Sequence, residues 1–155
     1  MNVPAIGWTL PPFRIDPVDP ERMKVMALLL HDPNPIHFDP ASVTSLGPDP
    51  RVINQGPISL GYVVTMLTGA LGDEARISSL ACRYLSNVRA GDAVTVGGEL
   101  VALAPLESGA TKASFEVWLD IDGGERALAG TATVTLPDDA SDAASQAGTK
   151  HERGD

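Results

Sequence analysis

Residues 56–72 read Gly-Pro-Ile-Ser-Leu-Gly-Tyr-Val-Val-Thr-Met-Leu-Thr-Gly-Ala-Leu-Gly and contain no charged side chain. Gly56-Pro57 is typical of a helix start and Gly72 of a helix end, so the stretch predicts a helix over 58–71. Apolar or small residues occupy nearly every face of that helix. A helix of this kind is normally surrounded by other protein. The stretch is shorter than the ~20 residues that a membrane span needs.

The sequence after this helix changes from helical to alternating periodicity, which is typical of strands. Turn signals rich in Gly, Pro and Asp separate the alternating runs. Four strands at hairpin spacing after one buried helix predict an α+β fold, with an antiparallel sheet curled around the helix. The predicted strands are 77–88, 93–104, 111–121 and 126–136.

The sequence before the buried helix contains a short strand and two helical segments. Phe13 to Ile15 is a possible strand. Asp19-Pro20-Glu21 combines an N-cap, a proline at the first helical position and an acid in the first turn, which predicts a helix to about His31. Asp39-Pro40 begins a second, shorter segment that reaches about Leu46. The first helix is expected to pack with one face, made of Met23, Met26, Ala27 and Leu30.

The length of 155 residues favours a single domain with a packed core. We place that domain at 1–137. From residue 138 onward Asp, Ala, Ser and Gly dominate without an apolar pattern. This composition predicts a disordered acidic tail over 138–155.

The formal net charge of −9 argues against nucleic-acid and anionic-membrane partners, because both require clustered Lys and Arg. The N-terminus has no secretory pattern, so we expect a soluble, cytoplasmic protein. The single cysteine, Cys82, lies in an alternating run and is predicted to be a small core residue. Three histidines and one cysteine offer no metal cluster, and no nucleotide-binding motif is present, so no cofactor or metal is expected.

The stretch Asp32-Pro33-Asn34-Pro35-Ile36-His37-Phe38-Asp39 carries the candidate chemistry. Each proline fixes its own φ and moves the preceding residue away from helical geometry. The segment should therefore be a stiff loop that directs two titratable side chains, Asp32 and His37, toward one point. Ordinary pKa values of about 3.9 for Asp and about 6.5 for His suit proton transfer near neutral pH.

This string resembles the signature of the MaoC-like, R-specific enoyl-CoA hydratases (hydratase 2), which have a hot-dog fold. Their motif reads Gly-Asp-x-Asn-Pro-Leu/Ile-His-x-Asp. Gln55-Gly56-Pro57 looks like the family's later His-Gly-Met at the start of the buried helix, and Gly91-Asp92 matches a later turn. The positions that match the first motif are Asp32, Asn34, Pro35, Ile36, His37 and Asp39.

The resemblance implies hydration of a trans-2-enoyl thioester to the (R)-3-hydroxyacyl thioester, or the reverse dehydration. Asp32 and His37 would be the catalytic dyad that activates one water. Asn34 would hold the water or the aspartate, or act only as a turn residue. The Gly56 N–H at the helix start would stabilise the negative charge on the thioester oxygen.

The chain departs from the family pattern at four positions. His31 stands where the family commonly has glycine, and Gln55 replaces the usual histidine. Pro57 has no N–H and cannot act as a second donor. Val64 falls where some members carry a helix serine near the dyad.

Other functions on the same fold remain open. A thioesterase also uses a carboxylate and a helix N-terminus, and an acyl-binding scaffold subunit needs no chemistry. Small residues of the buried helix, including Gly61 and Gly69, indicate either an acyl tunnel or close packing. The expected partners are an acyl-CoA or acyl-carrier-protein thioester, and a second copy or a different hot-dog chain.

Overall fold

The computed structural model describes residues 5–137, and the predicted tail 138–155 lies outside the described residues. Neighbouring strands in the described part are antiparallel and form one sheet in the order β1-β3-β4-β5-β2. The hairpins β3–β4 and β4–β5 form as predicted, but β2 pairs with β5 and not with β3, and it ends at Tyr84 and not at residue 88. The strands are β1 (Phe13–Ile15), β2 (Arg76–Tyr84), β3 (Val94–Pro105), β4 (Thr111–Ile121) and β5 (Glu125–Leu136).

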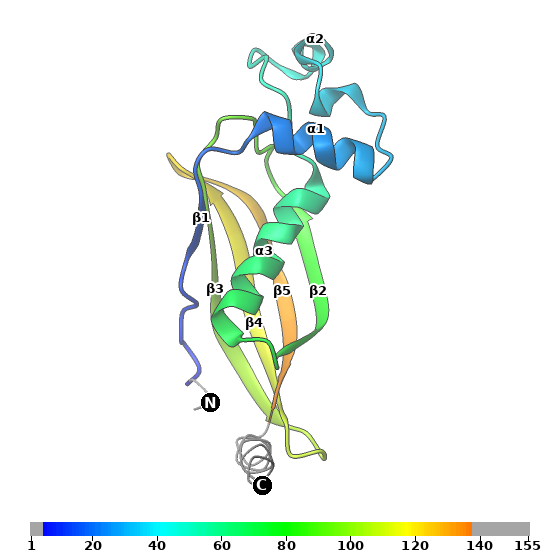
Figure 1. The fold of residues 1–155 in the computed structure, drawn as a ribbon. Coiled ribbons are helices and arrows are strands. Elements are labelled where there is room, and N and C mark those ends of the chain that lie inside the picture. Colours follow the sequence, from blue (N-terminus) through cyan, green and yellow to red (C-terminus); the bar gives the residue numbers. More distant parts are fainter. Residues whose placement is uncertain (1–4, 138–155) are drawn as a thin grey trace, which may run out of the picture.

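Helix α3 (Gly56–Leu71) runs along one face of this sheet (Figure 1). Its buried residues recur every three or four positions, so they form one stripe that packs on the inward side chains of β3 and β4. Phe115, Val117 and Leu119 alternate inward on β4, as their spacing predicts. The buried stripe of α3 is Ser59, Val63, Met66, Leu67 and Leu71.

The opposite face of α3 is exposed, which corrects the expectation of a helix buried on all sides. The reason is that the single sheet layer covers only one side of the helix (Figure 1). A Cβ at Gly61 or Gly69 would meet no atom within 4 Å. These glycines therefore line neither a tunnel nor a close contact in the single chain. The exposed α3 positions are Pro57, Gly61, Val64, Thr65, Thr68 and Gly69.

A layer of short helices lies over the N-terminal end of α3 (Figure 1). In the first of them the Asp19 carboxylate accepts the Glu21 N–H at 2.8 Å, which confirms the predicted cap. Met23 and Ala27 are buried as expected, but Leu30 is exposed because the helix ends one residue earlier. The layer comprises α1 (Pro20–Leu29), the 3-10 turn η1 (Pro35–His37), α2 (Pro40–Val43) and the 3-10 turn η2 (Thr44–Leu46).

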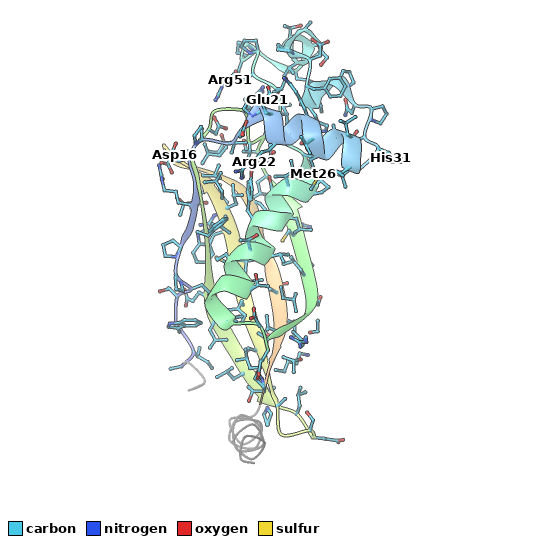
Figure 2. The ribbon with its side chains drawn as sticks, viewed as in Figure 1. Asp16, Glu21, Arg22, Met26, His31 and Arg51 are labelled. Carbon is cyan, nitrogen blue, oxygen red and sulfur yellow. The ribbon has the colours of Figure 1, made fainter. Side chains whose placement is uncertain are left out.

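His31 follows α1 with a φ of +52°, in the left-handed region that favours glycine. Figure 2 shows His31 at the far end of that helix. The Asp32 N–H donates back to the Ala27 carbonyl at 2.9 Å, so the chain turns out of the helix here. The motif of the resembling family has glycine at this position, and the left-handed backbone found here is the conformation that glycine adopts without strain. No described helix is both long and apolar enough to cross a membrane.

Candidate functional site

Asp32 and His37 face each other across the turn that joins α1 to η1. Asp32 Oδ2 lies 3.4 Å from His37 Nε2. The imidazole is 11% exposed and the carboxylate 31% exposed. The two predicted side chains are thus brought together, with the imidazole nearly buried and the carboxylate partly open to solvent.

The loop holds the aspartate through its own backbone. The Asn34 N–H donates to Asp32 Oδ1 at 3.1 Å. The Asn34 side chain in turn accepts the Ile36 N–H at 3.4 Å and caps η1. Asn34 therefore acts here as a turn residue, and its contact with Asp32 comes from the backbone and not from the side chain.

A backbone carbonyl fixes the imidazole of His37. His37 Nδ1 lies 2.7 Å from the carbonyl oxygen of Ile53. A carbonyl can only accept, so Nδ1 carries a hydrogen and donates it. The Ile53 N–H donates back to the Ile36 carbonyl at 2.9 Å, so the two segments are joined on both sides. Nε2 is then the ring nitrogen that faces Asp32.

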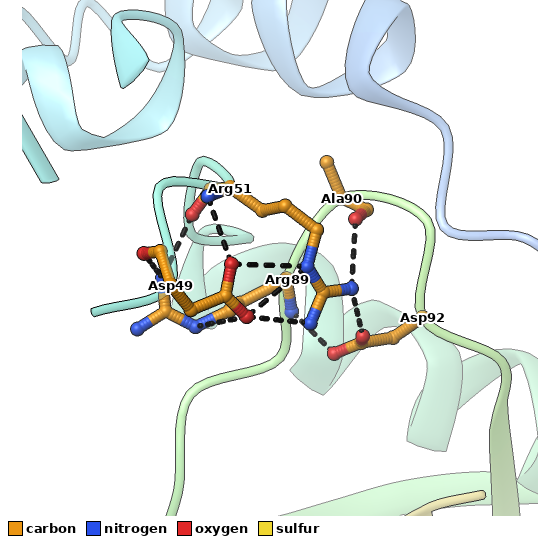
Figure 3. Close-up of polar contacts among 5 residues, drawn as sticks. All are labelled: Asp49, Arg51, Arg89, Ala90 and Asp92. Carbon is orange, nitrogen blue, oxygen red and sulfur yellow. Dashed lines mark hydrogen bonds and ion pairs between the residues drawn. The ribbon is translucent and has the colours of Figure 1, made fainter. Parts of the chain in front are cut away.

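Paired charges anchor the segment that contains Ile53 (Figure 3). Arg51 binds the Asp49 carboxylate at 2.7 Å, also contacts Asp92, and donates to the Ala90 carbonyl at 3.2 Å. Arg89 donates to the Arg51 carbonyl at 2.8 Å. The Arg51 guanidinium lowers the pKa of Asp49 to about 2 and its own pKa is raised, mainly by Asp49. This network ties the loop before α3 to the turn before β3.

Backbone hydrogen bonds to residues 88–90 of the same chain complete that attachment. The Ala90 N–H donates to the Val52 carbonyl at 2.9 Å, and the Asn54 N–H donates to the Val88 carbonyl at 2.8 Å. Ile53 also forms a bridge with Arg89. The carbonyl that orients His37 is therefore held by an extended strand-like pairing.

His37 lines a cavity of about 220 Å³ that also contains Gly56 at the start of α3. A Cβ at Gly56 would lie 2.9 Å from Cζ of Tyr84, so the absence of a side chain there makes room for the tyrosine ring. Burial raises the pKa of Tyr84, although the residue is 55% exposed. The remaining lining includes Ile36, Asn54, Ser59, Ser86, Asn87 and Leu128.

The first turn of α3 offers one free backbone donor at this cavity. The Ile58 and Ser59 N–H groups both donate to the Gln55 carbonyl, at 3.0 and 3.3 Å, and Pro57 has no N–H. Within residues 5–137 the Gly56 N–H has no acceptor. Gln55 is fully buried, and its Nε2 donates to the Met23 carbonyl at 2.9 Å, which joins α3 to α1.

Asp32 lines a second cavity, of about 420 Å³. Its walls are largely apolar and come from α1 and the following loop. Lys24 is the positively charged group among them. The walls are made by Lys24, Ala27, Leu28, Asp32, Pro33 and Phe38. His37 therefore lines a mixed cavity that includes Gly56, and Asp32 lines an apolar cavity walled in part by α1.

Comparison with protein families identifies the family of the chain. The model of the family described as "MaoC like domain" matches residues 6–116. The chain belongs to the MaoC-like domain family. This confirms the resemblance seen in the sequence, and the prediction of a hydro-lyase enzyme agrees with it. No curated protein sequence matches this MaoC-like chain.

Solved structures similar to this MaoC-like protein confirm the hot-dog fold. The (R)-hydratase from A. caviae involved in PHA biosynthesis is 24% identical with a TM-score of 0.76, covering 88% of this chain and 100% of that one. The ChsH1-ChsH2 complex from Mycobacterium tuberculosis is 23% identical with a TM-score of 0.73, at 88% and 100% coverage. The HadBC (3R-hydroxyacyl-ACP dehydratase) complex from the same organism is 16% identical with a TM-score of 0.68, at 87% and 99% coverage.

Four residues at the site were not predicted as site residues from the sequence of this MaoC-like protein: Ile53, Asn54, Ser59 and Tyr84. Ile53 contributes only a backbone carbonyl, which no side-chain pattern reveals. Tyr84 reaches Gly56 from the far edge strand. Asn54 and Ser59 are buried polar residues beside the helix start, and a polar side chain in an otherwise apolar stretch was the available signal. The described residues contain no group of three or more His, Cys, Asp or Glu arranged to hold a metal.

Proposed function

We propose that this MaoC-like protein is a hydro-lyase that adds water to a trans-2-enoyl thioester to give the (R)-3-hydroxyacyl thioester, or catalyses the reverse dehydration. The observation that carries the proposal is the 3.4 Å approach of Asp32 to the His37 nitrogen whose partner nitrogen is fixed by Ile53. Such a pair holds an acid and a base at one point, as addition of water to a conjugated double bond requires.

In the hydration direction the proton that is transferred starts on His37 Nε2, and Asp32 starts as a carboxylate. Asp32 takes a proton from water as the water oxygen bonds to C3 of the enoyl group. Electrons of the double bond move toward the thioester oxygen, and His37 then delivers its proton to C2. The proton on Asp32 passes to His37 across the 3.4 Å gap and restores the starting state. Asn34 positions Asp32 through its backbone N–H.

The thioester oxygen would lie beside Gly56. Negative charge develops on that oxygen during the reaction, and the free Gly56 N–H at the start of α3 can donate to it. The positive end of the helix dipole adds to the effect. The acyl chain would enter the apolar cavity that Asp32 lines. The net charge of −9 favours CoA over an acidic carrier protein, since like charges oppose docking, and we expect the enzyme in the cytoplasm.

We further propose that a second hot-dog chain, most simply another copy, covers the exposed side of the molecule. Within the described residues, edge strand β2 has an unpaired side, and Tyr84 and Leu85 leave apolar surface exposed. Exposed sheet edges and apolar patches are features of association surfaces. The ChsH1-ChsH2 and HadBC structures are complexes of two named chains, so a heteromer is the alternative.

The test is a panel of trans-2-enoyl-CoA substrates of increasing chain length, followed by loss of the conjugated-enone absorbance. We expect Asp32→Ala and His37→Ala each to lower kcat by about 100- to 10,000-fold, the usual contribution of a positioned acid or base. Equal rates for wild type and Asp32→Ala on every substrate would overturn the proposal. A thiol reagent in parallel reports release of free CoA, which would identify a thioesterase.

A further inference from the structure

The hydroxyl of Ser59 is the buried polar group at the site that the proposed mechanism leaves unused. Ser59 is 5% exposed and lines the same cavity as His37 and Gly56. It lies three residues after Gly56, so both residues occupy one face of the first turn of α3. The hydroxyl is therefore on the side of the helix from which the thioester oxygen would be stabilised.

Other hydroxyls of the same helix show what Ser59 does not do. Thr65 Oγ1 donates to the Gly61 carbonyl at 2.9 Å, and Thr68 Oγ1 donates to the Val64 carbonyl at 3.0 Å. Such bonds to the carbonyl four residues earlier are the usual arrangement for a hydroxyl within a helix. Across residues 5–137, Ser59 Oγ donates to no acceptor. Its proton is therefore available to a bound molecule.

Asn54 fixes the oxygen of that hydroxyl. Asn54 Nδ2 donates to Ser59 Oγ at 3.1 Å, and Asn54 is itself 6% exposed. A donated hydrogen bond occupies one lone pair of the serine oxygen, which orients and polarises its O–H. The other end of the amide, Asn54 Oδ1, is buried without a hydrogen-bond partner. That amide oxygen only accepts, as does a thioester oxygen, so Asn54 serves the proposed site through Nδ2 alone.

The helix start also lacks the second backbone donor that a pair of N–H groups would supply. Pro57 removes one N–H, and the next two are taken by the Gln55 carbonyl. We propose that Ser59 is a catalytic residue whose hydroxyl, held by Asn54, donates to the thioester oxygen together with the Gly56 N–H. The inference rests on the proposed hydro-lyase function and adds a named donor to it.

The experiment compares kcat and KM of wild type, Ser59→Ala, Ser59→Cys and Thr65→Ala on the best enoyl-CoA of the panel. A donor that acts mainly on the transition state raises kcat, so Ser59→Ala should lower kcat by about 100-fold or more with KM within a few-fold. Ser59→Cys keeps the side-chain volume with a weak donor and should lower kcat by at least about tenfold. Thr65→Ala removes a hydroxyl from the exposed face of the same helix and should leave kcat unchanged.

The outcomes separate this inference from the function that it rests on. If Asp32→Ala is inactive but the kcat values of Ser59→Ala and Ser59→Cys are both within threefold of wild type, the proposed role of Ser59 is wrong. The hydro-lyase proposal would then still stand. Asp32→Ala as active as wild type would overturn the hydro-lyase itself. If Ser59→Ala unfolds, as judged by its melting temperature, the volume-matched Ser59→Cys decides. An increase in KM with unchanged kcat for that variant would assign Ser59 to substrate binding and overturn the catalytic role.

Discussion

The imidazole of His37 donates from Nδ1 to the carbonyl oxygen of Ile53 at 2.7 Å, and this bond determines which nitrogen faces Asp32. The proton-transfer geometry therefore depends on a residue that lies 16 positions away and contributes no side-chain atom. A substitution that shifts the backbone of Ile53 should therefore change the orientation of the imidazole.

Arg51→Lys tests that dependence. Lysine keeps the charge but loses the planar fork that binds Asp49, Asp92 and the Ala90 carbonyl together. We expect kcat to fall, up to about 100-fold for an ångström of displacement of the imidazole, while the unfolding free energy falls by about 1 kcal/mol or less, as is usual for partly exposed ion pairs. Steady-state kinetics and thermal unfolding measure the two effects.

Arg126→Lys is the matched control for this change. The Arg126 fork likewise binds a carboxylate, that of Asp120, at 2.8 and 3.2 Å. Arg126 lies on β5 with its side chain exposed over the Trp118 ring, and it does not line the cavity that contains His37. Its replacement should leave kcat unchanged, and an equal loss of kcat in both variants would contradict the proposed link from Arg51 to His37.

The stabilisation contributed by Asp49 should depend on pH. Arg51 lowers the pKa of this carboxyl to about 2 from an ordinary 3.8. A lowered folded-state pKa stabilises the fold fully above the unfolded pKa, and that contribution disappears as pH falls through about 2. Asp49→Asn should therefore be less stable than wild type at pH 7, with the difference shrinking between about pH 4 and pH 2. Urea unfolding of both proteins across this range gives the difference; a constant gap would contradict the assignment.

The left-handed backbone at His31 predicts an order of stability among substitutions. Glycine is free of the Cβ clash in this region and asparagine tolerates it, whereas a β-branched residue does not. His31→Gly and His31→Asn should match or slightly exceed the stability of wild type. His31→Val should lose about 1–2 kcal/mol. Thermal unfolding of the three variants checks the order, and equal melting temperatures for the Gly and Val variants would contradict it.

Two glycine-to-alanine changes on α3 should have opposite consequences. At Gly56 a Cβ meets the end of the exposed Tyr84 ring, which can move, but it occupies the space that the thioester needs. Gly56→Ala should fold and lose at least about 100-fold in kcat, as expected when an oxyanion donor is obstructed. At Gly61 a Cβ meets nothing, so Gly61→Ala should keep full activity and gain about 0.5–1 kcal/mol. A fully active Gly56→Ala would contradict the placement of the thioester.

Association through the β2 side of the molecule is tested by Leu85→Glu. Leu85 is exposed in the single chain, so a charge there should not harm folding but should prevent burial against another chain. Light scattering is expected to give a dimer for wild type and a monomer for this variant. Leu106→Glu, in the distant β3–β4 turn, is the control and should remain dimeric. A wild-type monomer at all concentrations would contradict the homodimer.

The sequence contained the information for the hairpins and for the dyad, because alternation and proline act locally. Phe115, Val117 and Leu119 show the inward face of β4 directly, and the prolines around Asn34 enforce the turn that joins Asp32 to His37. The approach of the two side chains follows from short-range geometry that a single segment dictates.

The remaining features depend on contacts between distant segments. The Ile53 carbonyl reaches His37 only because residues 51–54 pair with 88–90. The outer face of α3 is apolar in sequence yet exposed, because one chain supplies one sheet layer. The pairing of Asn54 with Ser59 arises where a loop enters a helix, and periodicity does not describe that junction.

The dyad places its two proton-transfer groups side by side, and this has a stereochemical consequence. A planar enoyl group held against Asp32 and His37 meets both of them with the same face. Oxygen at C3 and hydrogen at C2 would therefore arrive from one side of the double bond, a syn addition. In deuterium oxide the product would carry a single C2 label with one relative configuration to its new hydroxyl.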